Sequence, residues 1–193
     1  MEFSGAVLAG GKSKRFGVDK ARFVWRGRPL LNWVMESLGG ASERFVVANR
    51  DYSDLGFPVV ADLIPGGDSL SGIHSALHHA RHDWVAVAAC DLPNLTPAYW
   101  RYLLERAGGQ RAVVAMGPEN WIEPLAALYH KELEPLAAMQ LAAGDYFLKR
   151  FVELAEALII PWEELEPLFG SHLFLNANRL EDLVGGGDQQ PPG

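Results

Sequence analysis

The segment from Leu8 to Lys20, LAGGKSKRFGVDK, combines the residue types that bind phosphate groups. Its adjacent glycines, Gly10 and Gly11, let the backbone turn sharply and come close to a ligand, because no Cβ atom is in the way. Seven of the seventeen basic residues fall between Lys12 and Arg28, although the chain has a formal net charge of -7. A positive, glycine-hinged loop on an acidic protein predicts a local site for a polyanion such as a nucleoside triphosphate.

Two cations of this segment and one later carboxylate are candidates for catalysis. Lys20 can neutralise charge on a triphosphate and on the transition state as a point charge, and Arg15 can assist it. Asp91 follows the apolar run VAVAAC. A carboxylate at the end of a buried strand can hold Mg²⁺ against phosphate oxygens. The alternative interpretation of Asp91 is an ordinary turn or helix-capping aspartate.

Three further polar residues, Asn49, Asp62 and Asn176, also directly follow apolar runs. In open α/β sheets, ligands bind at the carboxyl ends of the strands, so these residues are candidates for ligand binding. Asparagine and aspartate are also common in turns, and Asn178 could simply cap a last helix. The residue types alone leave both interpretations open.

The elements that would position these residues follow from the apolar pattern, in which strand-like and helix-like runs alternate. This pattern predicts one three-layer α/β/α domain with a mostly parallel sheet over residues 1–184. Strands are expected at 3–8, 45–48, 59–61, 84–89, 111–116, 125–129, 157–160 and 173–175. Helices are expected after Pro29, at 71–80, after Thr96-Pro97, at 131–143, at 162–169 and up to about 184. Residues 185–193 have no apolar anchor and should form a disordered tail.

The composition excludes several classes of protein. The single cysteine, Cys90, rules out an intramolecular disulfide and a cysteine-cluster metal site, and it favours a reducing cytoplasm. No apolar run reaches the ~18 residues of a membrane span. Outside residues 12–28 no patch is strongly basic, which argues against a nucleic-acid binder. We therefore expect a cytoplasmic protein, which we take to be a monomer.

Competing motifs fit less well. The dinucleotide-binding GxGxxG pattern is absent, because the glycines are adjacent. Residues 6–13, AVLAGGKS, fit a relaxed P-loop pattern, but 7–9 are strand-like where a P-loop needs its phosphate-binding loop. His74 and His78 have the i, i+4 spacing of a zinc pair, yet no third ligand suggests itself, so a solvated helix face is favoured. Cys90 is interpreted as a core thiol beside the site.

The combined pattern of LAGG, Ser13, Arg15-Phe16-Gly17, Asp19-Lys20 and the later Cys90-Asp91-Leu92-Pro93 resembles the nucleotidyltransferases that make molybdenum cofactor dinucleotides, specifically the molybdenum cofactor guanylyltransferases. The resemblance implies a Rossmann-like nucleotidyltransferase fold. It also implies Mg²⁺-dependent transfer of GMP from GTP to the terminal phosphate of the molybdenum cofactor, with release of pyrophosphate. Proteins that deliver the cofactor are possible partners.

The resemblance also assigns roles to residues. Those implied in catalysis are Lys20, Arg15 and Asp91, with Asp91 as the metal ligand. Those implied in nucleotide binding are Leu8, Ala9, Gly10, Gly11, Lys20, Asn49, Asp62, Gly72 and Asp91. Asn176 and Asn178 are implied on the acceptor side. The family often has arginine near 144–148, where this chain has Asp145-Tyr146-Phe147, which raises a shifted role for Lys149.

The preference for GTP is implied by LAGG, because the cytidylyl relatives tend to carry LAAG. A molybdenum cofactor cytidylyltransferase is therefore the nearest alternative. A P-loop NTPase or kinase, and a non-catalytic nucleotide-binding module that hands on the cofactor, are alternatives from other classes.

Overall fold

The computed structural model describes residues 1–10, 19–64 and 68–177. Its centre is a seven-stranded sheet in the order β5-β4-β1-β6-β8-β7-β9. The pairs β4–β5, β1–β4, β1–β6 and β7–β9 are parallel, whereas β8 runs antiparallel to β6 and β7. The strands are β1 (Phe3–Leu8), β4 (Glu43–Val47), β5 (Val59–Val60), β6 (Trp84–Ala89), β7 (Ala112–Met116), β8 (Ile122–His130) and β9 (Leu158–Ile160).

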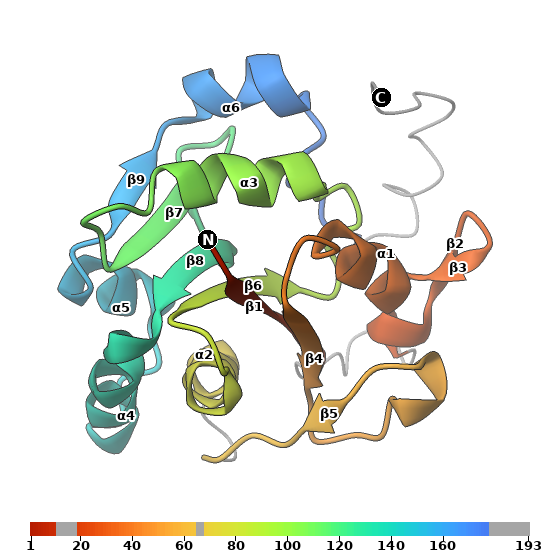
Figure 1. Ribbon diagram of the computed structural model, residues 1–193, viewed down its shortest axis with the longest axis horizontal. Coiled ribbons are helices and arrows are strands. Elements are labelled where there is room, and N and C mark those ends of the chain that lie inside the picture. Colours follow the sequence, from red (N-terminus) through yellow and green to blue (C-terminus); the bar gives the residue numbers. More distant parts are fainter. Residues whose placement is uncertain (11–18, 65–67, 178–193) are drawn as a thin grey trace.

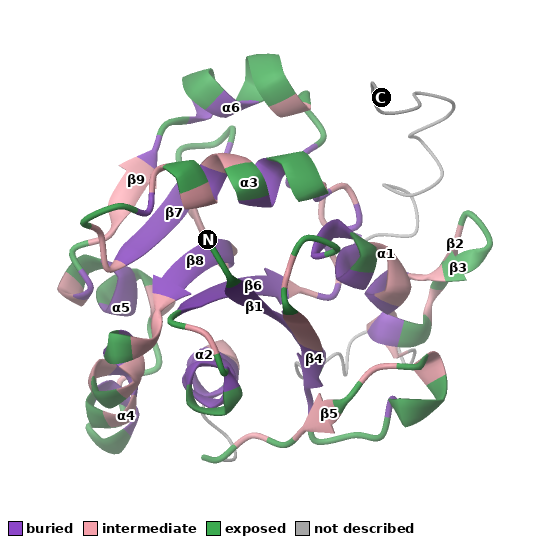
Figure 2. Cartoon of the chain, viewed as in Figure 1, coloured by how far each residue is buried: buried purple, intermediate pink, exposed green. Residues whose placement is uncertain are grey.

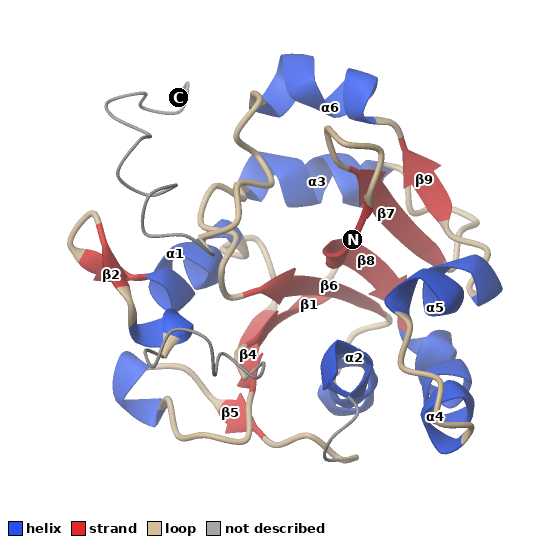
Figure 3. Ribbon diagram, turned by 180° about the vertical axis from the view of Figure 1, so that it is seen from behind, coloured by secondary structure: helices blue, strands red, loops and turns tan. Residues whose placement is uncertain are grey.

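Helices cover both faces of this sheet (Figures 1 and 3). One face carries α1 (Leu30–Ser37), α3 (Pro97–Glu105) and α6 (Trp162–Phe169), and the other carries α2 (Asp68–His79), α4 (Glu134–Ala142) and α5 (Leu148–Leu154). Each side has its own apolar core. Figure 2 shows the central strands buried and the outer helix faces exposed. The predicted three-layer α/β/α architecture with a mostly parallel sheet is confirmed.

The local sequence explains where several elements begin and end. Thr96 caps α3 by accepting a hydrogen bond from the backbone N–H of Tyr99, and Pro97 occupies the first turn, as predicted. Gly144 follows α4 with a φ of 72°, a left-handed conformation that glycine adopts without steric cost. A short hairpin, β2 (Val24–Trp25) and β3 (Arg28–Pro29), leads into α1.

Two predictions in the second half of the chain were wrong. The expected strand at 173–175 is a turn, in which the N–H of Leu175 donates to the carbonyl of His172 at 3.0 Å. Phe174 is buried because its ring packs against Tyr99 and Trp162, with centroids 5.8 and 5.9 Å away, and not because it joins the sheet. Helix α5 was not predicted, although its buried Phe151 and Val152 pack in the core beside α4.

None of the helices within residues 1–10, 19–64 and 68–177 is long and apolar enough to cross a membrane. The expected last helix up to about 184 and the expected tail at 185–193 lie outside the described residues.

Candidate functional site

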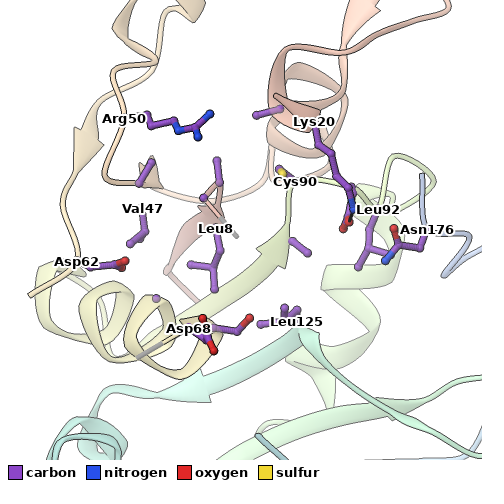
Figure 4. A pocket seen from close by; sticks show the side chains of 18 of the residues that line it. Leu8, Lys20, Val47, Arg50, Asp62, Asp68, Cys90, Leu92, Leu125 and Asn176 are labelled. Carbon is purple, nitrogen blue, oxygen red and sulfur yellow. Dashed lines mark hydrogen bonds and ion pairs between the residues drawn. The ribbon is translucent and has the colours of Figure 1, made fainter. Parts of the chain in front are cut away.

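A pocket lies along one edge of the sheet, where β1, β4, β5 and β6 end and the antiparallel β8 begins. It is lined from one side by residues after β4 and β5 and by the start of α2, and from the other by residues after β6, the start of β8 and the chain near Asn176. In Figure 4, Arg50 and Asp62 lie on one side of this pocket, and Lys20 and Asn176 lie on the other. The carboxyl ends of the parallel strands thus meet at one site, as predicted.

Lys20 and Asp91 form an ion pair in the wall of the pocket. The Nζ atom of Lys20 lies 3.2 Å from Oδ2 of Asp91, and the two side chains are 22% and 14% exposed. Asp91 lies one residue beyond the end of β6, after Cys90, and Lys20 opens a 3₁₀ helix, Lys20–Arg22. That helix is capped by Asp19, whose carboxylate accepts a hydrogen bond from the N–H of Ala21 at 3.1 Å. The short helix therefore holds the lysine over the strand end.

Tyr52 also binds the carboxylate of Asp19, which caps this helix. Its hydroxyl donates to Asp19 at 2.9 Å, and burial together with this carboxylate raises the pKa of the Tyr52 phenol well above its usual range. Tyr52 therefore stays neutral and keeps its donor proton. Sequence analysis did not single out Tyr52, because a tyrosine after a strand-end asparagine has no distinctive pattern.

Asn49 and Asp62 form a second polar pair, at the β4–β5 side of the pocket. The amide nitrogen of Asn49 donates to Oδ2 of Asp62 at 2.9 Å, and the backbone N–H of Asp62 donates to Oδ1 of Asn49 at 3.1 Å. Burial raises the pKa of Asp62, and the hydrogen bond from Asn49 opposes that shift. The two residues thus orient each other, although only Asp62 lines the pocket.

The described part of the glycine-rich segment forms the floor of the pocket. Leu8 ends β1, and Ala9 and Gly10 follow it, with Gly10 at a φ of 154° that other residues rarely adopt. Gly72 of α2 also lines the pocket, but its first constraint is packing: a Cβ there would lie 2.8 Å from Cδ1 of Leu8. A ligand-binding role for Gly72 stays a prediction.

The last lining segment is tied to the centre of the site through its backbone. The N–H of Ala177 donates to the carbonyl of Asp91 at 2.9 Å, which places Asn176 beside Asp91. The Oδ1 atom of Asn176 is buried and has no hydrogen-bond partner among the described residues. The described residues therefore leave the hydrogen-bonding capacity of this amide oxygen unused.

Some predicted residues do not enter this description. Gly11, Arg15 and Asn178 lie outside the described residues. Lys149 is on α5 and exposed, whereas the preceding Leu148 lines the pocket. The structure thus does not bring Lys149 to the site, because at the start of α5 the side that faces the pocket carries Leu148.

Besides Tyr52, the sequence analysis missed two charged residues that line the pocket, Arg50 and Glu123. Arg50 follows Asn49, is 68% exposed, and lies 3.8 Å from the Asp19 carboxylate. Glu123 lies at the start of β8, and burial, with a smaller effect of Asp91, raises the pKa of its carboxyl to about 7. The search for strand ends missed Glu123 because β8 is antiparallel and brings its first residues to this edge.

Two other expectations concern residues beside the site or away from it. Cys90 is buried, and desolvation raises the pKa of its thiol to about 12, consistent with a core thiol. The interpretation of His74 as part of a solvated helix face was wrong, because α4 packs against α2 and leaves this side chain only 7% exposed. Within the described ranges, no cluster of three or more histidine, cysteine, aspartate or glutamate residues could hold a metal ion.

Comparisons with known proteins agree with this geometry. Residues 5–158 match the family model of the MobA-like NTP transferase domain. The chain is 37% identical over 186 residues to a probable molybdenum cofactor guanylyltransferase of Deinococcus radiodurans, covering 95% of this chain and 93% of that protein. It is 33% identical over 191 residues to the molybdenum cofactor guanylyltransferase of Syntrophotalea carbinolica, covering 95% and 90%.

Among solved structures, the chain resembles a molybdopterin-guanine dinucleotide biosynthesis protein A from Archaeoglobus fulgidus. The TM-score is 0.79 at 26% sequence identity, over 94% of this chain and 95% of that one. With the family model covering most of the chain and the fold shared, the chain belongs to the family of MobA-like nucleotidyltransferases.

Proposed function

We propose that this protein transfers GMP from GTP to the terminal phosphate of the molybdenum cofactor in its molybdopterin form and releases pyrophosphate. The observation that carries the proposal is the Lys20–Asp91 pair, 3.2 Å apart, which lines one pocket together with Asp62, a carboxylate that Asn49 orients. A cation and a carboxylate on one side suit a phosphate chain, and a carboxylate oriented by an amide on the other side suits a nucleoside. The relatives named as molybdenum cofactor guanylyltransferases support the choice of substrates.

For the proposed transfer of GMP, the protein has to position the two substrates and neutralise the charge on their phosphates. An ionised acceptor phosphate is already a nucleophile, so it can attack the α-phosphorus in line without a general base. Lys20 is placed to neutralise the charge that develops on the phosphate oxygens, and Arg15 is proposed to assist it. Asn176 is proposed to contact the acceptor through its unpaired Oδ1 atom.

Asp91 fits a magnesium ion. It is the residue that would hold the ion, because its carboxylate supplies the hard oxygen donors that Mg²⁺ prefers. When bound, such an ion would offset negative charge on the phosphate chain. This role does not conflict with the Lys20 contact, since a carboxylate has two oxygens and several lone pairs.

The choice of base depends on the nucleoside side of the pocket. Gly10 leaves the floor without a side chain next to Ala48 and Asn49, and this open floor is compatible with a purine. Preferential turnover of CTP would replace GTP in the proposal without changing the reaction type. The P-loop alternative loses support, because Val7 and Leu8 lie in β1 and not in a phosphate-binding loop.

The test is product analysis with GTP labelled in the α- or the γ-phosphate, Mg²⁺ and a molybdopterin acceptor. Transfer of the α-label to the pterin with release of pyrophosphate is the expected result. Formation of GDP, or transfer of the γ-label, would refute guanylyl transfer. GTP binding without any product would instead favour a non-catalytic module.

A further inference from the structure

Glu123 lies at an irregularity of the sheet that pushes the chain into the pocket. In the β7–β8 register, Ala115 pairs with Glu123, whereas the next residue, Val114, pairs with Ala127. One step along β7 therefore corresponds to four steps along β8, so residues 124–126 of β8 have no partner in β7. Two of these residues, Pro124 and Leu125, line the pocket, and so does Glu123, which pairs with Ala115 at the edge of the irregularity. Such bulges commonly redirect side chains next to active sites.

The carboxyl group of Glu123 lies beside Gly117 without a hydrogen-bonding partner among the described residues. A Cβ at Gly117 would lie 2.8 Å from its Oε1 atom. No described residue forms a hydrogen bond or an ion pair with this carboxyl, and burial raises its pKa to about 7. The side chain is partly buried, so ionising the carboxyl without donors is costly, and donors from a ligand would relieve that cost.

The position of Glu123 along the sheet edge separates it from the nucleoside side. Asp62 follows β5, Asp91 follows β6, and Glu123 belongs to β8, the neighbour of β6 on the far side. Asp91 thus lies between the two outer carboxylates. With neighbouring strands about 4.8 Å apart, β5 and β8 are about 19 Å apart, which is long enough for two ring systems joined by phosphates.

The surroundings of Glu123 distinguish a ring system from a phosphate. Pro124, Leu125 and Leu148 supply apolar surface at this end of the pocket. The cations among the described lining residues are Lys20, paired with Asp91, and Arg50, on the opposite side. A phosphate would be repelled by an uncompensated carboxylate, whereas a flat heterocycle with N–H groups would match both the apolar walls and the acceptor oxygens.

We propose that Glu123 binds the pterin ring of the acceptor, accepting hydrogen bonds from the adjacent N–H groups of its 2-amino-4-oxopyrimidine edge. This inference rests on the proposed function, because it assigns one end of the pocket to the acceptor of that reaction. Glu123 is then an acceptor-binding residue, and Asp62 is its counterpart at the GTP end.

The experiment compares two fluorescent probes, 6-hydroxymethylpterin phosphate and the corresponding lumazine, which carries a carbonyl in place of the 2-amino group. Their binding is titrated with the wild-type chain, with Glu123→Gln, and with Glu119→Gln. Glu119 is an exposed acid in the same β7–β8 turn and serves as the matched control. GTP binding with Mg²⁺ and the KM values of both substrates are measured on the same proteins.

The wild-type protein and Glu119→Gln should prefer the pterin over the lumazine by about tenfold or more, as expected for hydrogen bonds to a charged group. Glu123→Gln should abolish that preference and raise the KM of the acceptor, while GTP affinity stays unchanged. An unchanged preference in Glu123→Gln, with weakened Mg²⁺-dependent GTP binding instead, would overturn the inference and make Glu123 a part of the cation site.

The two proposals fail in different ways. A wild-type protein that transfers GMP but does not distinguish pterin from lumazine would refute the role of Glu123 and leave the proposed function standing. A protein that distinguishes them through Glu123 but transfers no GMP would refute the proposed function and leave the pterin subsite standing. Comparable melting temperatures of the variants would confirm that folding is unaffected.

Discussion

The contact between Lys20 and Asp91 allows a prediction that separates catalysis from stability. We compare Lys20→Gln with Arg22→Gln, which removes a positive charge from the same 3₁₀ helix. The guanidinium of Arg22 does not line the pocket; it pairs with Asp54 at 2.6 Å and, more loosely, with Asp19 at 3.9 Å. Each variant thus loses one cation and its ion pairing, but only Lys20 lines the pocket.

The expected losses of stability are small in both cases. An exposed pair such as Arg22–Asp54 contributes little to stability, because solvent screens the two charges. The Lys20–Asp91 pair is only 22% and 14% exposed, so its loss should cost more than that of a surface pair but less than the ~3–5 kcal/mol of a fully buried one. We expect about 1–2 kcal/mol for Lys20→Gln, or a lowering of Tm by about 2–8 °C for a chain of this size.

The expected losses of activity differ greatly. Removal of one preorganised group that stabilises transition-state charge typically lowers turnover by about 10²–10³, equivalent to about 2.7–4 kcal/mol. A stability loss of about 1–2 kcal/mol leaves a domain with the usual ~5–15 kcal/mol almost entirely folded, so unfolding cannot account for such an effect. Arg22→Gln should keep near-normal turnover.

The assay is pyrophosphate release from GTP with acceptor and Mg²⁺, beside thermal unfolding of each variant. Equal losses of turnover in the two variants would mean that general charge, and not the position of Lys20, matters. Turnover within about tenfold of wild type in Lys20→Gln would likewise refute the proposed role of this residue.

Four further outcomes follow from the structure. Gly72→Ala should change stability by no more than about 1 kcal/mol, because its Cβ would lie 2.8 Å from Cδ1 at the movable end of Leu8 and alanine raises the helix propensity of α2; a loss above about 3 kcal/mol in urea unfolding would contradict this. Asn49→Ala should raise the KM for GTP more than that for the acceptor, since it removes the partner that orients Asp62; equal effects on both would argue against a nucleoside role. Burial lowers the pKa of His74, so the folded state disfavours its protonation. The stability should be full above about pH 6.5, the unfolded pKa, and should fall as the pH drops through the lowered pKa of the folded state. The control variant His74→Phe, which cannot be protonated, should reduce that pH dependence in urea titrations between about pH 5 and 8. Chelation with EDTA should weaken GTP binding by about tenfold or more in calorimetric titrations, and unchanged affinity would mean that no divalent ion takes part in nucleotide binding.

The predictable parts of this chain are those that local rules determine. Strands β1 and β6 were predicted with their observed ends, because largely apolar runs are followed closely by turn residues at Gly10 and Asp91. The N-terminus of α3 followed from Thr96 and Pro97. The turn at 171–174 could not be recognised locally, because its apolar residues are buried by tertiary contacts with α3 and α6.

The candidate site divides in the same way. Asn49, Asp62 and Asp91 follow parallel strands, and the direction of those strands predicts that they meet at one edge. Glu123 is the second residue of β8, and it reaches that edge only because β8 runs antiparallel to β6. Strand direction is a property of the whole sheet, so no local pattern could indicate that Glu123 belongs to the site.

The charges of the pocket explain why the binding of a polyanion needs more than the described lining residues. Those residues include five carboxylates, Asp19, Asp62, Asp68, Asp91 and Glu123, against two cations, Lys20 and Arg50, so the formal sum is 2 − 5 = −3 when all are ionised. A triphosphate would meet net repulsion from such a wall. The basic residues at 12–15 in the sequence and a divalent cation at Asp91 are the available sources of compensating charge. The acidity of the pocket is thus consistent with a nucleotidyltransferase that binds its triphosphate together with a metal ion, and it accounts for carboxylates being placed at both ends, where rings and not phosphates are expected.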